Sequence, residues 1–184
     1  MSSAEHRTTG PLLALLLLAA GCGEMARDLF PSGADERPPV VAGEIGPGVG
    51  QLAPDFTLPN VAGGSVTLYE ALASAPGVVL YFTMWCPICD SHMSDMQTYD
   101  IPAWPAVPFF ADDYVTGSVA EAGDAQAASG WGTSSFKVLA DVGAAVEGFY
   151  QAPMAVVVVD RNHVVQLNGE YTRERLTAVL GALP

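Results

Sequence analysis

The sequence predicts an α/β fold in which helices cover both faces of a mixed sheet. Residues 78–83 and 154–159 are apolar runs rich in β-branched or aromatic side chains, a pattern typical of strands buried on both faces. Segments 87–99, 118–129 and 173–183 have helical spacing or composition and alternate with strands along the chain. This alternation favours the α/β class.

Shorter elements fill the intervals between turn signals. In chain order they are an extended segment at 51–59, a turn at 60–64, a strand at 65–68, a helix at 69–73, and strands at 107–111, 136–139 and 163–167. Asp160 and Asn162 mark a turn before the last of these strands, which predicts that it is antiparallel to 154–159. The C-terminal helix begins after Thr172 and carries its apolar stripe on one face.

Length and charge limit the possible functions. The formal net charge is −13, from 7 basic and 20 acidic residues. Because nucleic-acid binding requires a basic surface, we expect no nucleic-acid partner. The same charge argues against a chain that lies flat on anionic lipid. Residues 51–184 suffice for one domain with its own core, and we expect it to act as a monomer.

A C-x-x-C motif, Cys86 and Cys89, joins the strand at 78–83 to the helix at 87–99. A pair at this junction indicates a redox-active dithiol. The unpaired N–H groups and the dipole at a helix N-terminus stabilise a thiolate, so we expect Cys86 to be the nucleophile, with a pKa below the ordinary value of about 8.5. Cys89, one turn later, is the expected resolving thiol, and Pro87 suits the first helical turn.

The same cysteine pair has two other interpretations, half of a zinc site and an inert structural disulfide. Zinc normally takes four ligands. Cys22 lies far away in the N-terminal tail, and His92 is the only histidine near the pair. We therefore expect no metal, and no cofactor other than the redox-active disulfide of Cys86 and Cys89.

The N-terminus predicts export from the cytoplasm. Residues 12–20 are apolar but too few to span a bilayer, which needs about 20, and they suit the core of a secretory signal peptide. The run ends in LAAGC at 18–22, which resembles a bacterial lipoprotein signal box. That resemblance implies cleavage after 1–21 and a lipid on Cys22 that anchors the chain to a bacterial membrane, facing outward. The alternative is an ordinary signal peptide that leaves Cys22 as a free thiol.

Residues 22–50 contain many Pro and Gly residues and no hydrophobic period. They are predicted to form a flexible stalk between the anchor and the domain at 51–184.

Four features, in order, resemble the redoxin branch of the thioredoxin superfamily, which includes TlpA-like thiol–disulfide oxidoreductases and AhpC/TSA peroxiredoxins. They are APDFTL at 53–58, WCPIC at 85–89, Ala152-Pro153, and the strand–turn–strand–helix ending. The resemblance implies a thioredoxin-like fold that exchanges disulfides with protein thiols and with a separate redox partner. It also implies a cis peptide bond at Pro153 and a substrate groove formed by Trp85, Pro87, Ala152 and Pro153.

Two positions depart from the family pattern of proton-transfer acids. Classical thioredoxins carry a buried acid six residues before the first cysteine, where this chain has Leu80. Many TlpA-like proteins carry an acid six residues after it, where this chain has His92. His92 is either a possible proton acceptor for Cys89 or a half-exposed polar residue of the helix.

Two alternative functions remain open besides thiol–disulfide exchange. Thr83 and Cys86 match part of the peroxiredoxin motif, although the proline expected four residues before that threonine is Val79. A Sco-like copper-binding protein, which is not an enzyme, is the other. Those proteins usually space their cysteines C-x-x-x-C and place a histidine before the last strands, whereas His163 follows the strand at 154–159.

Overall fold

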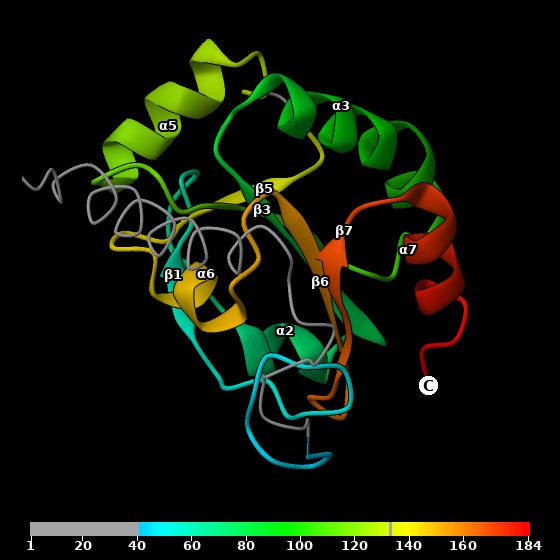
Figure 1. Ribbon diagram of the computed structural model, residues 1–184. Helices are drawn as coiled ribbons and strands as arrows, with labels where there is room; N and C mark the ends of the chain where they lie inside the picture. The colour runs from blue at the N-terminus through cyan, green and yellow to red at the C-terminus, as the bar shows by residue number, and fades with distance from the viewer. Residues whose placement is uncertain (1–40, 133) are drawn as a thin grey trace, which may run out of the picture. The chain divides into compact units, whose positions relative to one another are not determined.

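A five-stranded mixed sheet forms the centre of the structure (Figure 1). Its strands lie in the order β5 (Lys137–Ala140), β4 (Phe109–Asp113), β3 (Gly77–Thr83), β6 (Ala155–Asp160) and β7 (Val165–Glu170). The structure is a computed structural model that describes residues 41–132 and 134–184. The predicted signal peptide, Cys22 and the stalk as far as residue 40 lie outside the described residues. The predicted α/β class is confirmed, with helices on both faces of the sheet.

The strands and helices follow one another in the predicted order. They are β1 (Thr57–Pro59), β2 (Ser65–Thr67), α2 (Leu68–Ala73), β3 (Gly77–Thr83), α3 (Pro87–Asp95), the π-helical turn η1 (Met96–Asp100), α4 (Ile101–Ala103), β4 (Phe109–Asp113), α5 (Val119–Ala128), β5 (Lys137–Ala140), α6 (Ala145–Tyr150), β6 (Ala155–Asp160), β7 (Val165–Glu170) and α7 (Arg173–Leu180). A separate two-stranded sheet pairs β1 with β2.

The two most apolar strands lie in the middle of the sheet. β3 is parallel to β4 and antiparallel to β6, and every residue of β3 and β6 is buried. Such strands lose almost all contact with water, which explains their continuous apolar sequences. Because β3 and β6 run in opposite directions, the carboxyl end of β3 and the start of β6 meet at the same end of the sheet.

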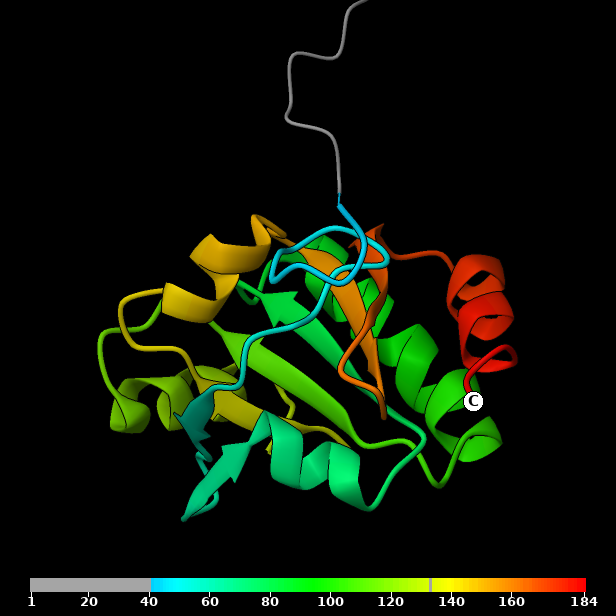
Figure 2. The ribbon, with the colours of Figure 1, turned by 90° about the horizontal axis from the view of Figure 1, so that it is seen from below.

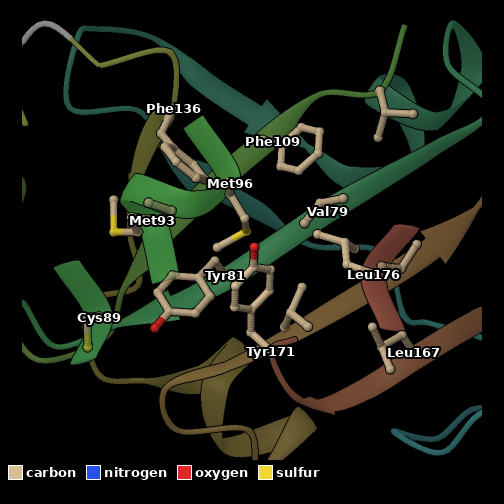
Figure 3. Packing of buried hydrophobic residues seen from close by; sticks show 14 of the residues in the cluster. Val79, Tyr81, Cys89, Met93, Met96, Phe109, Phe136, Leu167, Tyr171 and Leu176 are labelled. Carbon is tan, nitrogen blue, oxygen red and sulfur yellow. The ribbon is translucent and has the colours of Figure 1, made fainter. Parts of the chain in front are cut away.

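Alternate residues of the strands serve two separate cores. On one face α3, η1 and α7 pack over Val79, Tyr81 and their neighbours, as Figure 3 shows. On the other face α2 and α6 cover Leu80, Phe82 and the side chains next to them. Figure 1 shows α3 and α5 on one side of the sheet and α2 and α6 on the other.

Several elements differ from their prediction. β7 covers Val165–Glu170 where the strand was predicted at 163–167, and the helix predicted at 87–99 continues as the π-helical turn η1 after Asp95. β4 covers Phe109–Asp113, two residues later than the predicted strand at 107–111, because its pairing with β3 continues through Asp112 and Asp113. α6 was not predicted. It is a single short helix, and the carboxylate of Asp141 accepts hydrogen bonds from the backbone N–H groups of its first three residues.

The domain also begins earlier than predicted. Residues 41–50, assigned from the sequence to the flexible stalk at 22–50, hydrogen-bond with the sheet. The N–H of Gly50 donates to the carbonyl of Val165 (2.9 Å), and the side-chain amide of Asn168 donates to the carbonyl of Pro47 (3.0 Å). Figure 2 shows this segment, drawn blue to cyan, running over the end of β6 and β7.

Candidate active site

The two cysteines of the C-x-x-C motif lie in contact where β3 ends and α3 begins. Their sulfur atoms are 2.6 Å apart, and both thiols are free. The two side chains differ in access, since Cys86 is half-buried whereas Cys89 is fully buried beneath it. An incoming group therefore reaches Cys86 first, and Cys89 is within bonding reach of Cys86.

Local backbone geometry fixes the position of Cys86. It is the N-cap residue of α3, with extended backbone, and its sulfur accepts a hydrogen bond from the N–H of Cys89 (3.2 Å). The helix begins at Pro87, as the sequence predicts. A sulfur atom at this position faces the unpaired N–H groups of the first helical turn, which favour negative charge there.

Cys89 is surrounded by hydrogen-bond partners that favour its thiolate. Burial raises the pKa of Cys89, but hydrogen bonds with the Cys86 side chain, the backbone of Met84 and Cys86, and the Thr83 side chain outweigh it. The net effect holds the pKa of Cys89 below its ordinary value. Because the two sulfurs lie in contact, either thiol can donate a hydrogen bond to the other.

Tyr81 connects Cys89 to His92. The side chain of Tyr81 hydrogen-bonds with that of Cys89, and Figure 3 shows its hydroxyl pointing toward the cysteine. On its other side the same hydroxyl lies 3.0 Å from Nδ1 of His92. Burial raises the pKa of Tyr81, as do the nearby cysteines, so the phenol stays protonated at neutral pH. Cys89, Tyr81 and His92 therefore form a continuous line of exchangeable protons.

His92 is half-buried between charged and aromatic neighbours. Its ring packs 5.0 Å from that of Tyr171, measured between centroids. Burial lowers the pKa of His92 below the ordinary 6.5, while the negative charges of Glu170 and Asp95 raise it without offsetting the burial. The imidazole is therefore mainly neutral at pH 7 and able to accept a proton.

Asp113, which the sequence analysis missed, organises the loop that precedes Cys86. Its carboxylate accepts hydrogen bonds from Trp85 Nε1 (2.8 Å) and from the N–H groups of Val115 (3.1 Å) and Thr116 (3.2 Å). Trp85 has a left-handed backbone (φ 57°), a conformation that costs about 1–3 kcal/mol in a bulky residue. The bonds to Asp113 help to hold Trp85 in this strained position.

The segment before β6 differs from what the resemblance implies. All peptide bonds of the described residues are trans, so the expected cis bond at Pro153 is wrong. The chain instead reverses with Met154 in the left-handed region (φ 55°) and a hydrogen bond from the N–H of Ala155 to the carbonyl of Ala152 (3.1 Å). Met154 reaches the site, with its sulfur 3.6 Å from that of Cys86.

The four residues predicted to form the groove have different surroundings. Trp85 packs half-buried against the core under α3, while Pro87 and Pro153 are exposed. Ala152 is buried (2% exposed) in the core of the opposite face, so it is not available to line a groove. The exposed surface around Cys86 instead includes the neighbouring side chains Met84 and Ile88, which are 42% and 58% exposed.

Comparisons with known proteins agree with this architecture. The AhpC/TSA family model matches residues 49–101, which include both cysteines. No curated protein matches the sequence. Among solved structures, MTB dsbF superposes with a TM-score of 0.58 at 22% identity, over 70% of this chain and 95% of that chain. The fold is therefore thioredoxin-like.

Two further solved structures with this fold come from Mycobacterium tuberculosis. A secreted disulfide oxidoreductase homologous to E. coli DsbE gives a TM-score of 0.52 at 20% identity, over 70% of this chain and 96% of that chain. The peroxidoxin BcpB gives 0.56 at 17% identity, over 73% and 95%. The fold is thus shared by a protein named a disulfide oxidoreductase and by one named a peroxidoxin, so the fold alone does not decide between these two activities.

Sequence reasoning missed three residues of this site, which come from β3, the end of β4 and the turn before β6. Tyr81 was assigned only to an apolar strand, Asp113 lay beyond the predicted end of its strand, and Met154 was assigned to a core strand. The position of Tyr81 one residue out of phase with Leu80 and Phe82 was the available signal, since it places its side chain on the face under α3.

Proposed function

We propose that this protein is a thiol–disulfide oxidoreductase that exchanges disulfides with other proteins through Cys86 and Cys89. The observation that carries the proposal is the asymmetric pair: an accessible sulfur at a helix N-terminus in contact with a fully buried second sulfur. Such a pair passes a disulfide between molecules in two steps.

In the reducing direction, the Cys86 thiolate attacks one sulfur of a client disulfide. A mixed disulfide forms and the other client sulfur leaves as a thiolate, which takes up a proton. Cys89 then loses its proton and attacks Cys86, which releases the second client thiol and leaves a Cys86–Cys89 disulfide. Two electrons have moved from the dithiol to the client. The reverse sequence oxidises a client, and the reduction potential decides between a thioredoxin-like reductant, at about −270 mV, and a DsbA-like oxidant, at about −120 mV.

A direct assay tests this function. The reduced protein is expected to reduce insulin disulfides much faster than the reductant alone does, and to consume hydrogen peroxide little faster than an ordinary reactive thiol. Insulin reduction and stopped-flow peroxide oxidation, run on the same preparation, give the comparison. Rapid peroxide consumption without insulin reduction would assign the protein to the peroxidases instead.

The surroundings of Thr83 argue against that alternative. A peroxidase threonine must offer its hydroxyl to the peroxide at the reactive cysteine. Here Thr83 is fully buried, and its hydroxyl accepts the N–H of Trp85 (3.1 Å) and hydrogen-bonds with Cys89. The Thr83 hydroxyl is therefore hydrogen-bonded within the protein and is not directed at a peroxide bound beside Cys86.

The hydrogen bonds that connect Cys89 through Tyr81 to His92 support a route for the proton that Cys89 loses. The thiol proton passes to the oxygen of Tyr81 while the Tyr81 hydroxyl proton passes to Nδ1 of His92. His92, which is half-exposed, then exchanges its proton with solvent. In this proposal His92 is the proton acceptor that replaces the family carboxylate, and Tyr81 connects it to the buried sulfur.

Removing the Tyr81 hydroxyl tests this route. In Tyr81→Phe, resolution of a mixed disulfide by Cys89 is expected to slow by about 10²-fold, the usual contribution of a positioned acid or base. In the wild type this rate falls as the pH drops below the lowered pKa of His92, because a protonated ring accepts no proton. His92→Gln removes this pH dependence. Single-turnover rapid quench from pH 5 to 8 measures both effects.

Tyr69 provides a matched control, because it packs on the face of the sheet opposite to Tyr81 and Cys89. Its ring stacks there on that of His163 (3.7 Å between centroids). Tyr69→Phe removes the same atom and should leave the resolution rate unchanged. An unaltered pH profile in His92→Gln would contradict the proton route while leaving the exchange reaction intact.

We further propose that a lipid on Cys22 anchors the protein to a bacterial membrane, on the extracytoplasmic side. The part of the chain that the structure describes includes no helix long and apolar enough to cross a bilayer. The proposal rests on the signal-like run at 12–20 and the LAAGC sequence that follows it.

Cys22→Ser is expected to move the protein from the membrane to the soluble fraction, because it removes the only lipid attachment that we propose. Cell fractionation and the intact mass of the wild-type protein measure this. Wild-type protein that is soluble and carries no acyl mass would refute the anchor.

A further inference from the structure

A third sulfur atom completes a cluster at the end of β3. The thioether of Met154 lies 3.6 Å from the sulfur of Cys86, which in turn lies 2.6 Å from that of Cys89. Two of the three sulfurs come from the start of α3 and the third from the turn before β6. The disulfide-exchange reaction uses only the two thiols and gives no role to the thioether.

The fold holds Met154 in this position at a cost. Tyr81 of β3 pairs with Val156 of β6, so the turn that precedes β6 lies beside the loop that follows β3. Met154 adopts a left-handed backbone that costs a non-glycine residue about 1–3 kcal/mol. Its backbone also hydrogen-bonds with Tyr114, which follows β4. The thioether is thus held beside the cysteines by the strands on either side of β3.

The chemistry of this donor set selects a soft monovalent metal. Thiolate and thioether ligands favour Cu(I), whereas zinc normally requires four ligands and magnesium or calcium requires oxygen. Within the described ranges, no group of three or more His, Cys, Asp or Glu side chains is arranged to hold a metal ion. The third sulfur beside Cys86 and Cys89 is that of Met154, and a thioether is a ligand typical of Cu(I) and not of zinc sites.

We propose that reduced Cys86 and Cys89, together with Met154, bind one Cu(I) ion in a three-sulfur site. Binding replaces the two thiol protons with the metal and transfers no electrons. The Cys86–Cys89 disulfide lacks the thiolates, so only the dithiol form binds. With metal–sulfur bonds of about 2.3 Å, as for zinc thiolates, trigonal sulfurs lie about 4 Å apart. The sulfurs of Cys86 and Met154 are near this spacing. Rotation of the half-exposed Cys86 side chain lengthens the shorter distance between the sulfurs of Cys86 and Cys89.

The net charge of the protein supports capture of a cation. The formal charge of −13 produces a negative field that attracts positive ions. Cys86 and Met154 are both partly accessible, so copper delivered by a soluble carrier reaches two of the three ligands without unfolding of the site.

Copper K-edge X-ray absorption of the full-length protein tests the coordination. The protein is reduced, kept without oxygen, labelled with selenomethionine and carries Cys22→Ser, so that this third cysteine supplies no ligand. With one equivalent of Cu(I), we expect two copper–sulfur bonds and one copper–selenium bond. A spectrum with sulfur alone would overturn the proposal, as would failure of the dithiol form to bind copper. Neither result bears on insulin reduction, which is measured separately.

A competition assay with a Cu(I)-specific chelator tests the contribution of each methionine. Met154→Leu is expected to weaken Cu(I) binding at least about tenfold, since even residues outside the first shell of metal ligands contribute 10- to 100-fold. Met84→Leu, the same change at an exposed methionine two residues before Cys86, should bind as the wild type does. Circular dichroism confirms that both variants are folded. Equal affinities of the two variants would refute the role of Met154.

Discussion

Cys86→Ser is expected to reduce protein-disulfide exchange by at least ~10³-fold, because a serine hydroxyl is not ionised at neutral pH and cannot form the mixed disulfide. Cys89→Ser is expected to stop the reaction at the mixed disulfide. Cys86 remains accessible and reactive, but the buried sulfur that resolves the mixed disulfide is absent. Client proteins should therefore accumulate in disulfide linkage to Cys86, which non-reducing gel electrophoresis and mass spectrometry detect.

The third cysteine supplies the control for this pair of variants. Cys22→Ser makes the same change outside the redox domain and should leave insulin reduction by purified protein unchanged. Mixed disulfides that accumulate equally in Cys86→Ser and Cys89→Ser would show that the two thiols are interchangeable, contrary to their different burial.

Asp112→Leu is expected to stabilise the domain by about 1–3 kcal/mol at neutral pH, the cost of an unsatisfied buried polar group. Asp112 is fully buried, and neither carboxylate oxygen has a hydrogen-bond partner among the described residues. Burial raises the pKa of Asp112, and the negative charges of Asp141, Asp113 and Glu147 raise it further. Urea denaturation at several pH values measures the effect.

The direction of the pH dependence follows from the raised pKa of Asp112. The folded protein binds this proton more tightly than the unfolded chain does. Its contribution to stability is therefore complete below the unfolded pKa of about 4 and is lost as the pH rises through the higher folded pKa. Asp112→Leu should abolish this loss of stability with rising pH. The stability gained by the substitution is therefore larger at pH 8 than at pH 5.

Asp160 is a matched control because it is almost as buried as Asp112 (3% against 0% exposed) but has hydrogen-bond partners. Its carboxylate accepts the N–H groups of Asn162 and Val164 and the side-chain amide of Gln166. Asp160→Leu leaves these donors without a partner and should destabilise the domain by about 1–3 kcal/mol. If both leucine variants were destabilised alike, burial of an unpartnered carboxylate would not explain Asp112.

Local signals were sufficient to predict most of the fold. The apolar run of β3, the C-x-x-C that follows it and the serine and threonine that cap α5 and α7 depend on neighbours in the sequence. The end of β4 does not depend on neighbours in the sequence. Asp112 and Asp113 interrupt the apolar pattern, and only their pairing with Phe82 and Thr83 across the sheet keeps them in a strand. A polar residue in a central strand is not recognised from periodicity alone.

The site was predictable where it is contiguous in the sequence and unpredictable where it is not. Cys86 and Cys89 are close in the sequence, and their arrangement follows from their position at the N-terminus of a helix. Met154 is close to Cys86 through an antiparallel pairing between segments 68 residues apart. The resemblance to known redoxins placed a cis proline there, and the trans bond with a left-handed Met154 could not be inferred from the residues themselves.

The segments that border the sheet affect how the protein meets other chains. Gly50 and Gln51 bond to Val165 at the start of β7, and the N–H of Val61 donates to the carbonyl of Val138 in β5 (3.0 Å). Both outer strands thus have part of their backbone already occupied. An extended peptide cannot add to the full length of either edge as a further strand, which also limits edge-to-edge aggregation between copies. Unfolded clients are therefore expected to bind at the cysteines without joining the sheet.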